Sequence, residues 1–284
     1  MPEYAITFAG RSVLIRHESQ AVASWLAFLF GEMAGDAGTR PPDSVLEIVS
    51  VGGQSGKLVL IDNDRDWATG ALGVFFAAVL FDRVIFHLLN ENDVGVALHA
   101  AAVACGPEAI LIPGQSGSGK STLAAWLAAR GFVYLTDELV FLPAAPLHLR
   151  CFTRPLHIKP GARELVKSML AAGEASALLE DGHGMIVPHR MLNPAPSAAN
   201  VSPSVLLFPM YRPGTRLQVE QISRAQAGAG LMACNVNGRN LTDHGFAQIM
   251  SVAGAAPAWR LSYGSFDGLD ETIAGLLRGI SNRP

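Results

Sequence analysis

A glycine-rich run between two apolar segments is the part of this 284-residue sequence best suited to chemistry. It consists of Gly114, Gln115, Ser116, Gly117, Ser118, Gly119, Lys120, Ser121 and Thr122. The glycines would let consecutive backbone N–H groups surround a phosphate, and a helix beginning here would add the positive end of its dipole. Lys120 would then contact the β- and γ-phosphates and Ser121 would ligate Mg²⁺. The full pattern between a strand and a helix favours an ATP-binding loop over a chance glycine turn.

Two adjacent carboxylates follow one helix and one strand later. Asp137 and Glu138 interrupt the apolar segment 132–142, and we expect them at a strand end beside the loop. Phosphoryl transfer needs one carboxylate to hold Mg²⁺ and another to accept the proton of the attacking hydroxyl. The sequence predicts a catalytic acidic pair, and it leaves open which of the two is the base.

His99 is placed by a predicted hairpin. The apolar segments 99–105 and 108–114 flank Gly106 and Pro107, which is typical of a tight turn. Counting back from that turn puts His99 opposite Gly114, at the phosphate end of the sheet. The imidazole could bond a phosphate oxygen or tune a carboxylate, and a buried structural histidine is an equally good interpretation.

Composition excludes several classes of protein. A net charge of -3 argues against binding to nucleic acid or to an anionic membrane surface. Three cysteines without CxxC spacing indicate neither a disulfide framework nor a zinc site. The start of the chain lacks a secretory signal and the apolar stretch 70–89 is interrupted by charges. We therefore expect a cytoplasmic protein without membrane insertion.

The pattern of apolar residues predicts two domains. Residues 1–93 alternate strands and amphipathic helices, with a long helix beginning near Thr69, and form an α+β module of no evident chemistry. Residues 94–284 have the strand, loop and helix order of an α/β domain. Within the second domain, residues 173–202 show no clear period, and we expect a surface loop there.

The residues that carry the predicted chemistry resemble a known family. The runs LHAAAV (98–103), IPGQSGSGKSTLAAWLAARG (112–131) and TDE (136–138) resemble the catalytic domain of bacterial HPr kinase/phosphorylase, and more closely the HPr-kinase-related serine kinases. The resemblance is strongest from 98 to 142 and implies a P-loop core related to phosphoenolpyruvate carboxykinase. By position, His99 matches the family's active-site histidine, Glu138 its proton-accepting aspartate and Asp137 the acid beside it. For this group the resemblance implies a serine acceptor on a peptide or small protein, including precursor peptides of lasso-type natural products.

The chain also departs from the family pattern. Its acidic pair is Asp-Glu where the family usually has Asp-Asp, and the EIRG-type signature of the true HPr enzymes is absent. The segments 153–161 and 183–189 resemble parts of the related kinases, which adds four second-rank candidates: Arg154, Lys159, His183 and His189. Arg260 is a fifth, either stabilising a transferring phosphate or lying on the surface of a strand.

We therefore expect a Mg²⁺-ATP-dependent kinase acting on a seryl hydroxyl. A kinase of small metabolites and a non-catalytic nucleotide-sensing module are the alternatives. An enclosed acceptor pocket would favour the small-metabolite kinase. Negligible turnover of ATP would favour the nucleotide-sensing module. A GTPase is disfavoured because no NKxD motif follows the loop. Oligomeric state is open, and a homo-oligomer is compatible with the sequence.

Overall fold

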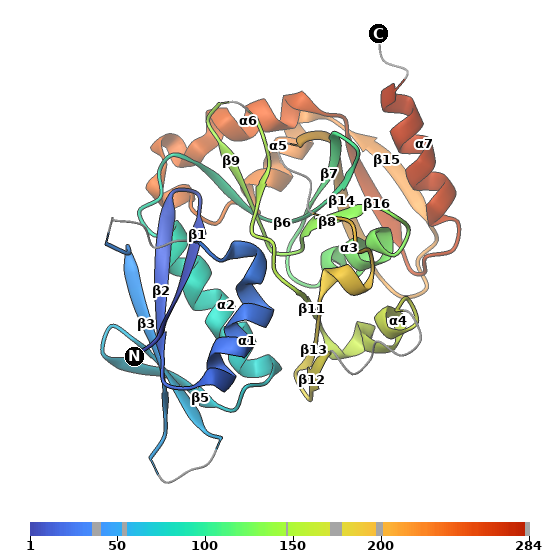
Figure 1. Ribbon diagram of the computed structural model, residues 1–284. Helices are drawn as coiled ribbons and strands as arrows, with labels where there is room; N and C mark the ends of the chain where they lie inside the picture. The colour runs from blue at the N-terminus through green and yellow to red at the C-terminus, as the bar shows by residue number, and fades with distance from the viewer. Residues whose placement is uncertain (36–40, 53–55, 146, 171–177, 197–200, 282–284) are drawn as a thin grey trace. The chain divides into compact units, whose positions relative to one another are not determined.

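The computed structural model describes residues 1–35, 41–52, 56–145, 147–170, 178–196 and 201–281 (Figure 1). The chain divides into two compact units. Unit 1 comprises Met1–Asn92 and Phe152–Leu192, and unit 2 comprises Asp93–Cys151 and Asn193–Pro284. Both contain helices packed on sheets, which confirms a mixed α/β protein.

Unit 1 is built on a five-stranded sheet of order β1-β2-β3-β4-β5. The strands are β1 (Glu3–Phe8), β2 (Arg11–His17), β3 (Ser44–Ser50), β4 (Leu58–Asp62) and β5 (Arg65–Gly70). The helices are α1 (Gln20–Phe30) and α2 (Val74–Leu89). The expected start of the second helix near Thr69 is wrong, because Thr69 pairs with Val59 inside β5. Helix α2 begins only after Gly73, where the side chain of Asp181 accepts a hydrogen bond from Val74 N at 2.8 Å.

A second part of unit 1 comes from the middle of the chain. It contains β11 (Leu156–Ile158), α4 (Arg163–Lys167), β12 (Leu179–Asp181) and β13 (Gly184–Val187), and the three strands form a sheet of order β11-β13-β12. Assigning residues 94–284 to one continuous domain is therefore a misassignment for 152–192. The ring of Phe152 packs edge-on against Phe8 at 5.5 Å, and the guanidinium of Arg154 lies 4.6 Å from the centre of the Phe81 ring.

The expected surface loop over 173–202 is also corrected in part. Its described residues include β12 and β13, which pair as a hairpin, and Gly184 to Val187 are all buried. Residues 173–177 and 197–200 lie outside the described residues. Mixed Gly, Ala and Pro composition hid these short strands, since three or four residues are too few to show a period.

Unit 2 is built on an eight-stranded sheet whose main path is β10-β9-β6-β7-β14-β16-β15, with β8 also paired to β6. The strands are β6 (Gly95–Cys105), β7 (Glu108–Pro113), β8 (Val133–Thr136), β9 (Leu139–Pro143), β10 (Arg150–Cys151), β14 (Ser202–Tyr211), β15 (Gln218–Ile222) and β16 (Ala258–Tyr263). Three of them, β7, β14 and β16, are parallel neighbours. Their carboxyl ends therefore meet at one edge, the usual place for a ligand in an α/β sheet.

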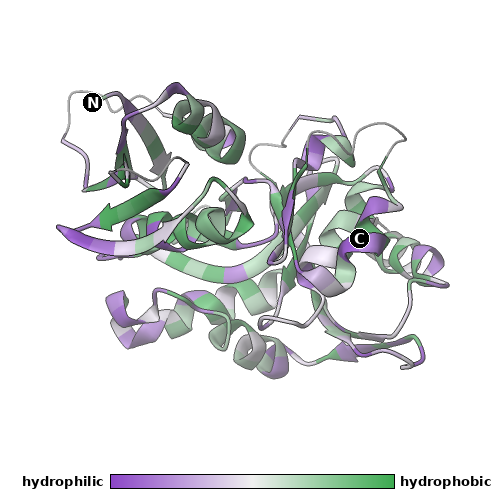
Figure 2. Ribbon diagram, turned by 90° about the horizontal axis from the view of Figure 1, so that it is seen from below, coloured by the Kyte–Doolittle hydropathy of each residue, from purple (hydrophilic) through white to green (hydrophobic). Residues whose placement is uncertain are grey.

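Helices cover both faces of this sheet. They are α3 (Lys120–Ala128), α5 (Arg224–Met232), α6 (Phe246–Ala255) and α7 (Leu269–Ser281). Alternate residues of β6, from Val96 to Ala104, share one buried cluster with α5 and α6, and α3 packs against β6 and β8. Figure 2 shows hydrophobic residues along many of the strands and helices of the protein. The small alanines of β6 let the helices approach closely and place the loop after β7 on a rigid base.

Candidate phosphate-binding and phosphoryl-transfer site

The predicted strand, loop and helix are present. Strand β7 ends at Pro113 and α3 begins at Lys120. Gly117 and Gly119 have φ of +87° and +98°, which residues with a Cβ rarely adopt. At position 114 the reason for glycine is steric and not conformational, because a Cβ there would lie 2.6 Å from Oγ of Ser118. These glycines shape a compact loop that leads directly into the first turn of a helix, as a phosphate cradle requires.

Lys120 lies over this loop. Its Nζ donates hydrogen bonds to the carbonyl oxygens of Gly114 at 2.6 Å and Gln115 at 3.0 Å, and the residue is only 5% exposed. The two carbonyls satisfy part of the demand of a buried ammonium for acceptors. A positive charge is thus held at the mouth of the loop, next to the N-terminus of α3. Both features favour an anion at this position.

The two carboxylates interrupt one extended segment. Strands β8 and β9 both pair with the same edge of β6. Val133 of β8 lies opposite Ala104, and Pro143 of β9 lies opposite Gly95. Asp137 and Glu138 lie at the break between them, where Oγ1 of Thr136 accepts hydrogen bonds from the backbone N of Glu138 and of Leu139. The predicted single strand is two strands, β8 and β9, and both acids lie between them, directly after the end of β8 as expected for a strand end.

The two acids have different environments. Asp137 is 1% exposed and its Oδ1 accepts a hydrogen bond from the hydroxyl of Tyr134 at 2.9 Å. The side chain of Glu138 is 37% exposed and its Oε1 lies 3.5 Å from Nε2 of His99, whose side chain is 29% exposed. Asp137 is thus fixed inside the protein, whereas Glu138 and His99 are accessible. Accessibility suits a proton acceptor, which must reach the incoming hydroxyl.

The hairpin that places His99 is confirmed. Ala100 pairs with Pro113 and Cys105 pairs with Glu108, so β6 and β7 pair as predicted up to the last residue before the loop. His99 is the next residue of β6 beyond that ladder. The imidazole is part of the site and is not a fully buried structural histidine. It lies on β6, next to the residue that pairs with Pro113 at the start of the glycine-rich loop.

A short segment after α5, unnoticed in the sequence, lies along β6 beside the loop. The carbonyl of Cys234 accepts a hydrogen bond from His99 N at 2.8 Å, and Asn237 bonds to the backbone of both Ala97 and Gly95. Burial raises the pKa of the Cys234 thiol, while the nearby charge of Lys120 and the Gly114 N–H partly oppose that rise. This thiol therefore lies against the base of the loop. No motif marks the segment, because its pairing with β6 is a single isolated bridge, Leu98 with Asn235, supplemented by side-chain hydrogen bonds of Asn237.

Two tyrosines at the ends of parallel strands hold the other side of the loop. The backbone N of Tyr211 donates to the carbonyl of Ser118 at 3.1 Å. The hydroxyl of Tyr263 lies 3.4 Å from the carbonyl of Gly119. A Cβ on Gly119 would lie 2.6 Å from that hydroxyl and 3.0 Å from Cβ of Tyr211. One sequence signal could have found these two tyrosines: two apolar strands both end in tyrosine, as PMY (209–211) and LSY (261–263).

The second-rank candidates are divided between the two units. Arg154, Lys159, His183 and His189 belong to unit 1. Arg260 lies on β16 in unit 2, where its Nη1 forms an ion pair with Glu220 at 2.8 Å across the surface. This contact agrees with the interpretation of Arg260 as a surface residue.

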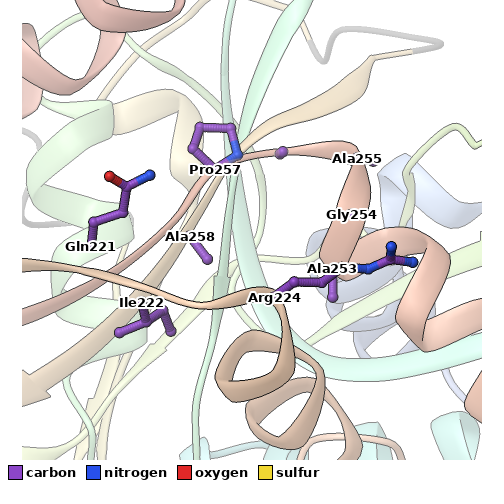
Figure 3. Close-up of a pocket in the computed structure, with 9 residues that line it drawn as sticks. Gln221, Ile222, Arg224, Ala253, Gly254, Ala255, Pro257 and Ala258 are labelled. Atoms are coloured by element: carbon purple, nitrogen blue, oxygen red, sulfur yellow. The ribbon is translucent and has the colours of Figure 1, made fainter.

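A hollow of about 280 Å³ lies elsewhere in unit 2, between the end of α6 and the start of β16 (Figure 3). Its one ionisable lining residue, Arg224, donates two hydrogen bonds to the carbonyl of Met250. Ala258, in the lining, begins β16, and Tyr263 ends it. The hollow is therefore at the opposite end of that strand from the loop, and it brings together none of the predicted catalytic residues.

The donor set at the loop suits magnesium bound together with a nucleotide. The described residues contain no ready-made cluster of three or more His, Cys, Asp or Glu side chains that could hold a metal ion. Mg²⁺ typically takes one or two protein ligands and completes its shell with phosphate oxygens and water. Ser121, in the first turn of α3, and Asp137, directly after β8, carry oxygen ligands of the right chemical type. Among the described residues, no helix is long and apolar enough to cross a membrane.

Comparisons with known proteins show a similarity among solved structures alone. No protein-family model matches the chain, and no curated protein matches it. Among solved structures, the chain is similar to the Hpr(Ser) kinase/phosphatase from Coxiella burnetii at 15% identity, with 64% of this chain and 88% of that chain covered. The TM-score is 0.29. A score this low establishes no common fold, so the assignment of function depends on the site itself.

Proposed function

We propose that the chain is a Mg²⁺-ATP-dependent kinase that transfers the γ-phosphoryl group to a serine hydroxyl of a peptide or small protein. The observation that carries this proposal is the pairing of Glu138 with His99 at the same sheet edge as the loop under Lys120. Phosphate-binding groups and an accessible proton acceptor are the two parts that such a transfer requires.

Each side chain takes a separate part of the reaction. The N–H groups of the loop and Lys120 bind the phosphates, with the Lys120 ammonium moving from the carbonyls of Gly114 and Gln115 to phosphate oxygens. Ser121 and Asp137 would hold Mg²⁺, which supplies charge neutralisation when bound. Glu138 takes the proton as the acceptor O–H bond breaks. The acceptor oxygen bonds to the γ-phosphorus, the bond to the β,γ-bridging oxygen breaks, and ADP leaves.

The environments of the two acids decide between their roles. Asp137 is buried and fixed by Tyr134, which suits a ligand that must stay in place. Glu138 is accessible and lies beside His99, and an imidazole at 3.5 Å can orient the carboxylate and stabilise its charged form when protonated. We therefore assign Glu138 as the general base, His99 as the residue that positions it and Asp137 as the metal ligand.

The test is a transfer assay with γ-labelled ATP, Mg²⁺ and serine-containing peptides, read by mass spectrometry, with hydroxyl-bearing metabolites in parallel. Lys120→Met should abolish nucleotide binding. Glu138→Gln should retain it while lowering transfer by about 10²- to 10⁴-fold, the usual contribution of a general base. Glu108→Gln is the matched control, since Glu108 lies at the opposite end of β7. Unchanged transfer in Glu138→Gln would remove the assignment, and ATP binding without transfer to any acceptor would favour a nucleotide sensor.

A further inference from the structure

An exposed aromatic side chain lies at the edge of the phosphate loop and has no part in the chemistry assigned above. Tyr211 ends β14 and is 40% exposed, although its backbone N is bonded to the carbonyl of Ser118 inside the loop. Its ring packs edge-on against the ring of Tyr263, with centroids 5.4 Å apart. An accessible ring is therefore fixed directly beside the phosphate site.

The backbone around Tyr211 holds the ring in place. Arg212 N donates to the carbonyl of Tyr263 at 3.0 Å, which continues the pairing of β14 with β16 beyond the strand ends. The following turn packs against Gly264, where a Cβ would lie 2.5 Å from the backbone N of Thr215 and 2.7 Å from the carbonyl of Arg212. Tyrosine has only two side-chain torsions, so little freedom is lost when a ligand covers its ring.

The strand order sets the direction in which a nucleotide must lie. The loop follows β7, and the acids and His99 come from β8, β9 and β6 on one side of it. Tyr211 and Tyr263 come from β14 and β16 on the other side. A triphosphate whose γ-phosphoryl group faces Glu138 must direct its ribose and base away from the acids. The base then lies over the β14 side of the loop.

We propose that Tyr211 is the stacking surface for the base of the nucleotide. This inference rests on the proposed nucleotide-binding function of the loop. Tyr263 is 0% exposed and can only support the ring of Tyr211 from behind. Because stacking uses the π-face that every base has, Tyr211 contributes affinity and does not select adenine over guanine.

The adjacent residue provides a matched control. Met210 is 39% exposed, almost the same as Tyr211. Successive side chains of a strand point to opposite faces, so Met210 shares the face of Phe208. The Phe208 ring lies against α5, where a Cβ on Gly230 would be 2.5 Å from it. Met210→Ala removes a similar exposed side chain from the same strand end without touching the proposed stacking face.

The experiment compares two ligands, Mg²⁺-ATP and Mg²⁺-tripolyphosphate, which has the phosphates but no base. Calorimetry is performed on the intact chain and on Tyr211→Ala, Tyr211→Phe and Met210→Ala. We expect Tyr211→Ala to weaken ATP binding by about 5- to 150-fold, the usual worth of one aromatic stacking contact. Its affinity for tripolyphosphate should be unchanged. Tyr211→Phe and Met210→Ala should bind both ligands as the unaltered chain does.

Two results would overturn the inference. Unchanged ATP affinity in Tyr211→Ala shows that the ring does not stack on the base. An equal loss for ATP and tripolyphosphate shows that Tyr211 only supports the loop. In either case the unaltered chain still binds ATP, so the proposed function survives. An unaltered chain that binds neither ligand refutes the stacking role and the nucleotide-binding function together.

Discussion

Replacing Gly119 by alanine should disable the loop for two separable reasons. The first is backbone conformation: φ of +98° places alanine in a region that costs about 1–2 kcal/mol for a residue with a Cβ. The second is a clash, because the new Cβ would lie 2.6 Å from the hydroxyl of Tyr263. Overpacking of this kind costs about 1–3 kcal/mol. The two contributions together come to roughly 2–5 kcal/mol.

Gly117 separates the two contributions. Its φ is +87°, but a Cβ at Gly117 would meet nothing within 4 Å. Gly117→Ala therefore carries only the conformational cost, and we expect about 5- to 30-fold weaker binding of Mg²⁺-ATP by calorimetry. Gly119→Ala carries both the conformational cost and the clash, and we expect its affinity for Mg²⁺-ATP to fall by about 30-fold or more. The midpoint temperature of thermal unfolding should change little in either variant, because the loop can relieve the strain by shifting when no ligand is bound.

The double variant Gly119→Ala/Tyr263→Phe completes the cycle. Removing the hydroxyl leaves the Tyr263 Cζ at 3.5 Å from the added Cβ, an ordinary contact. ATP affinity should then recover in part toward that of Gly117→Ala, because Cβ of Tyr211 still lies 3.0 Å from the added Cβ. The coupling between the two sites should equal the share of the overpacking that the Tyr263 hydroxyl causes. Equal affinities of the two single glycine variants, or no recovery in the double variant, would refute the reasoning that Tyr263 limits the space at Gly119.

Three further expectations can be checked on single variants. Tyr134→Phe removes the hydrogen bond to Asp137 and should lower the rate of phosphoryl transfer while the affinity for ATP is retained. Single-turnover kinetics would measure this rate, and an unchanged rate would contradict the expectation. Burial lowers the pKa of His189, so the unfolded chain takes up the proton first as pH falls. The free energy of unfolding should therefore decrease from about pH 7 to about pH 5, and less so in His189→Gln by urea denaturation. Mass spectrometry after brief alkylation should find Cys105, which is exposed, labelled before the buried Cys234; the reverse order would contradict the burial.

Local patterns predicted the hairpin and the glycine-rich loop of unit 2. The turn at Gly106 and Pro107 determines the register of the hairpin, and that register brings His99 to the strand end beside the last residue of β7. The loop is equally local, since its glycines and Lys120 are consecutive and lie between a strand and a helix. Such features depend on neighbours in the chain, which a single sequence displays directly.

Features that depend on distant residues could not be predicted in this way. Tyr211 and Tyr263 reach the loop only because β14 and β16 follow β7 in the sheet, an order that no short pattern records. The start of α2 depends on Asp181, more than a hundred residues later. The difference in burial between Asp137 and Glu138 is likewise set by the tertiary structure, because the two acids are chemically alike and adjacent in sequence.

The split composition of unit 1 has a consequence for synthesis of the chain on the ribosome. Its first 92 residues emerge early, yet Asp181, which bonds to the first turn of α2, and Phe152, which packs on Phe8, belong to the segment that ends at Leu192. At about 5–20 residues per second, that segment is completed roughly 5–20 s later. In the interval, the apolar surfaces of the nascent module lack their native partners and are open to chaperones. A cut at residue 93 would divide unit 1 between the two fragments and leave unit 2 whole in the second.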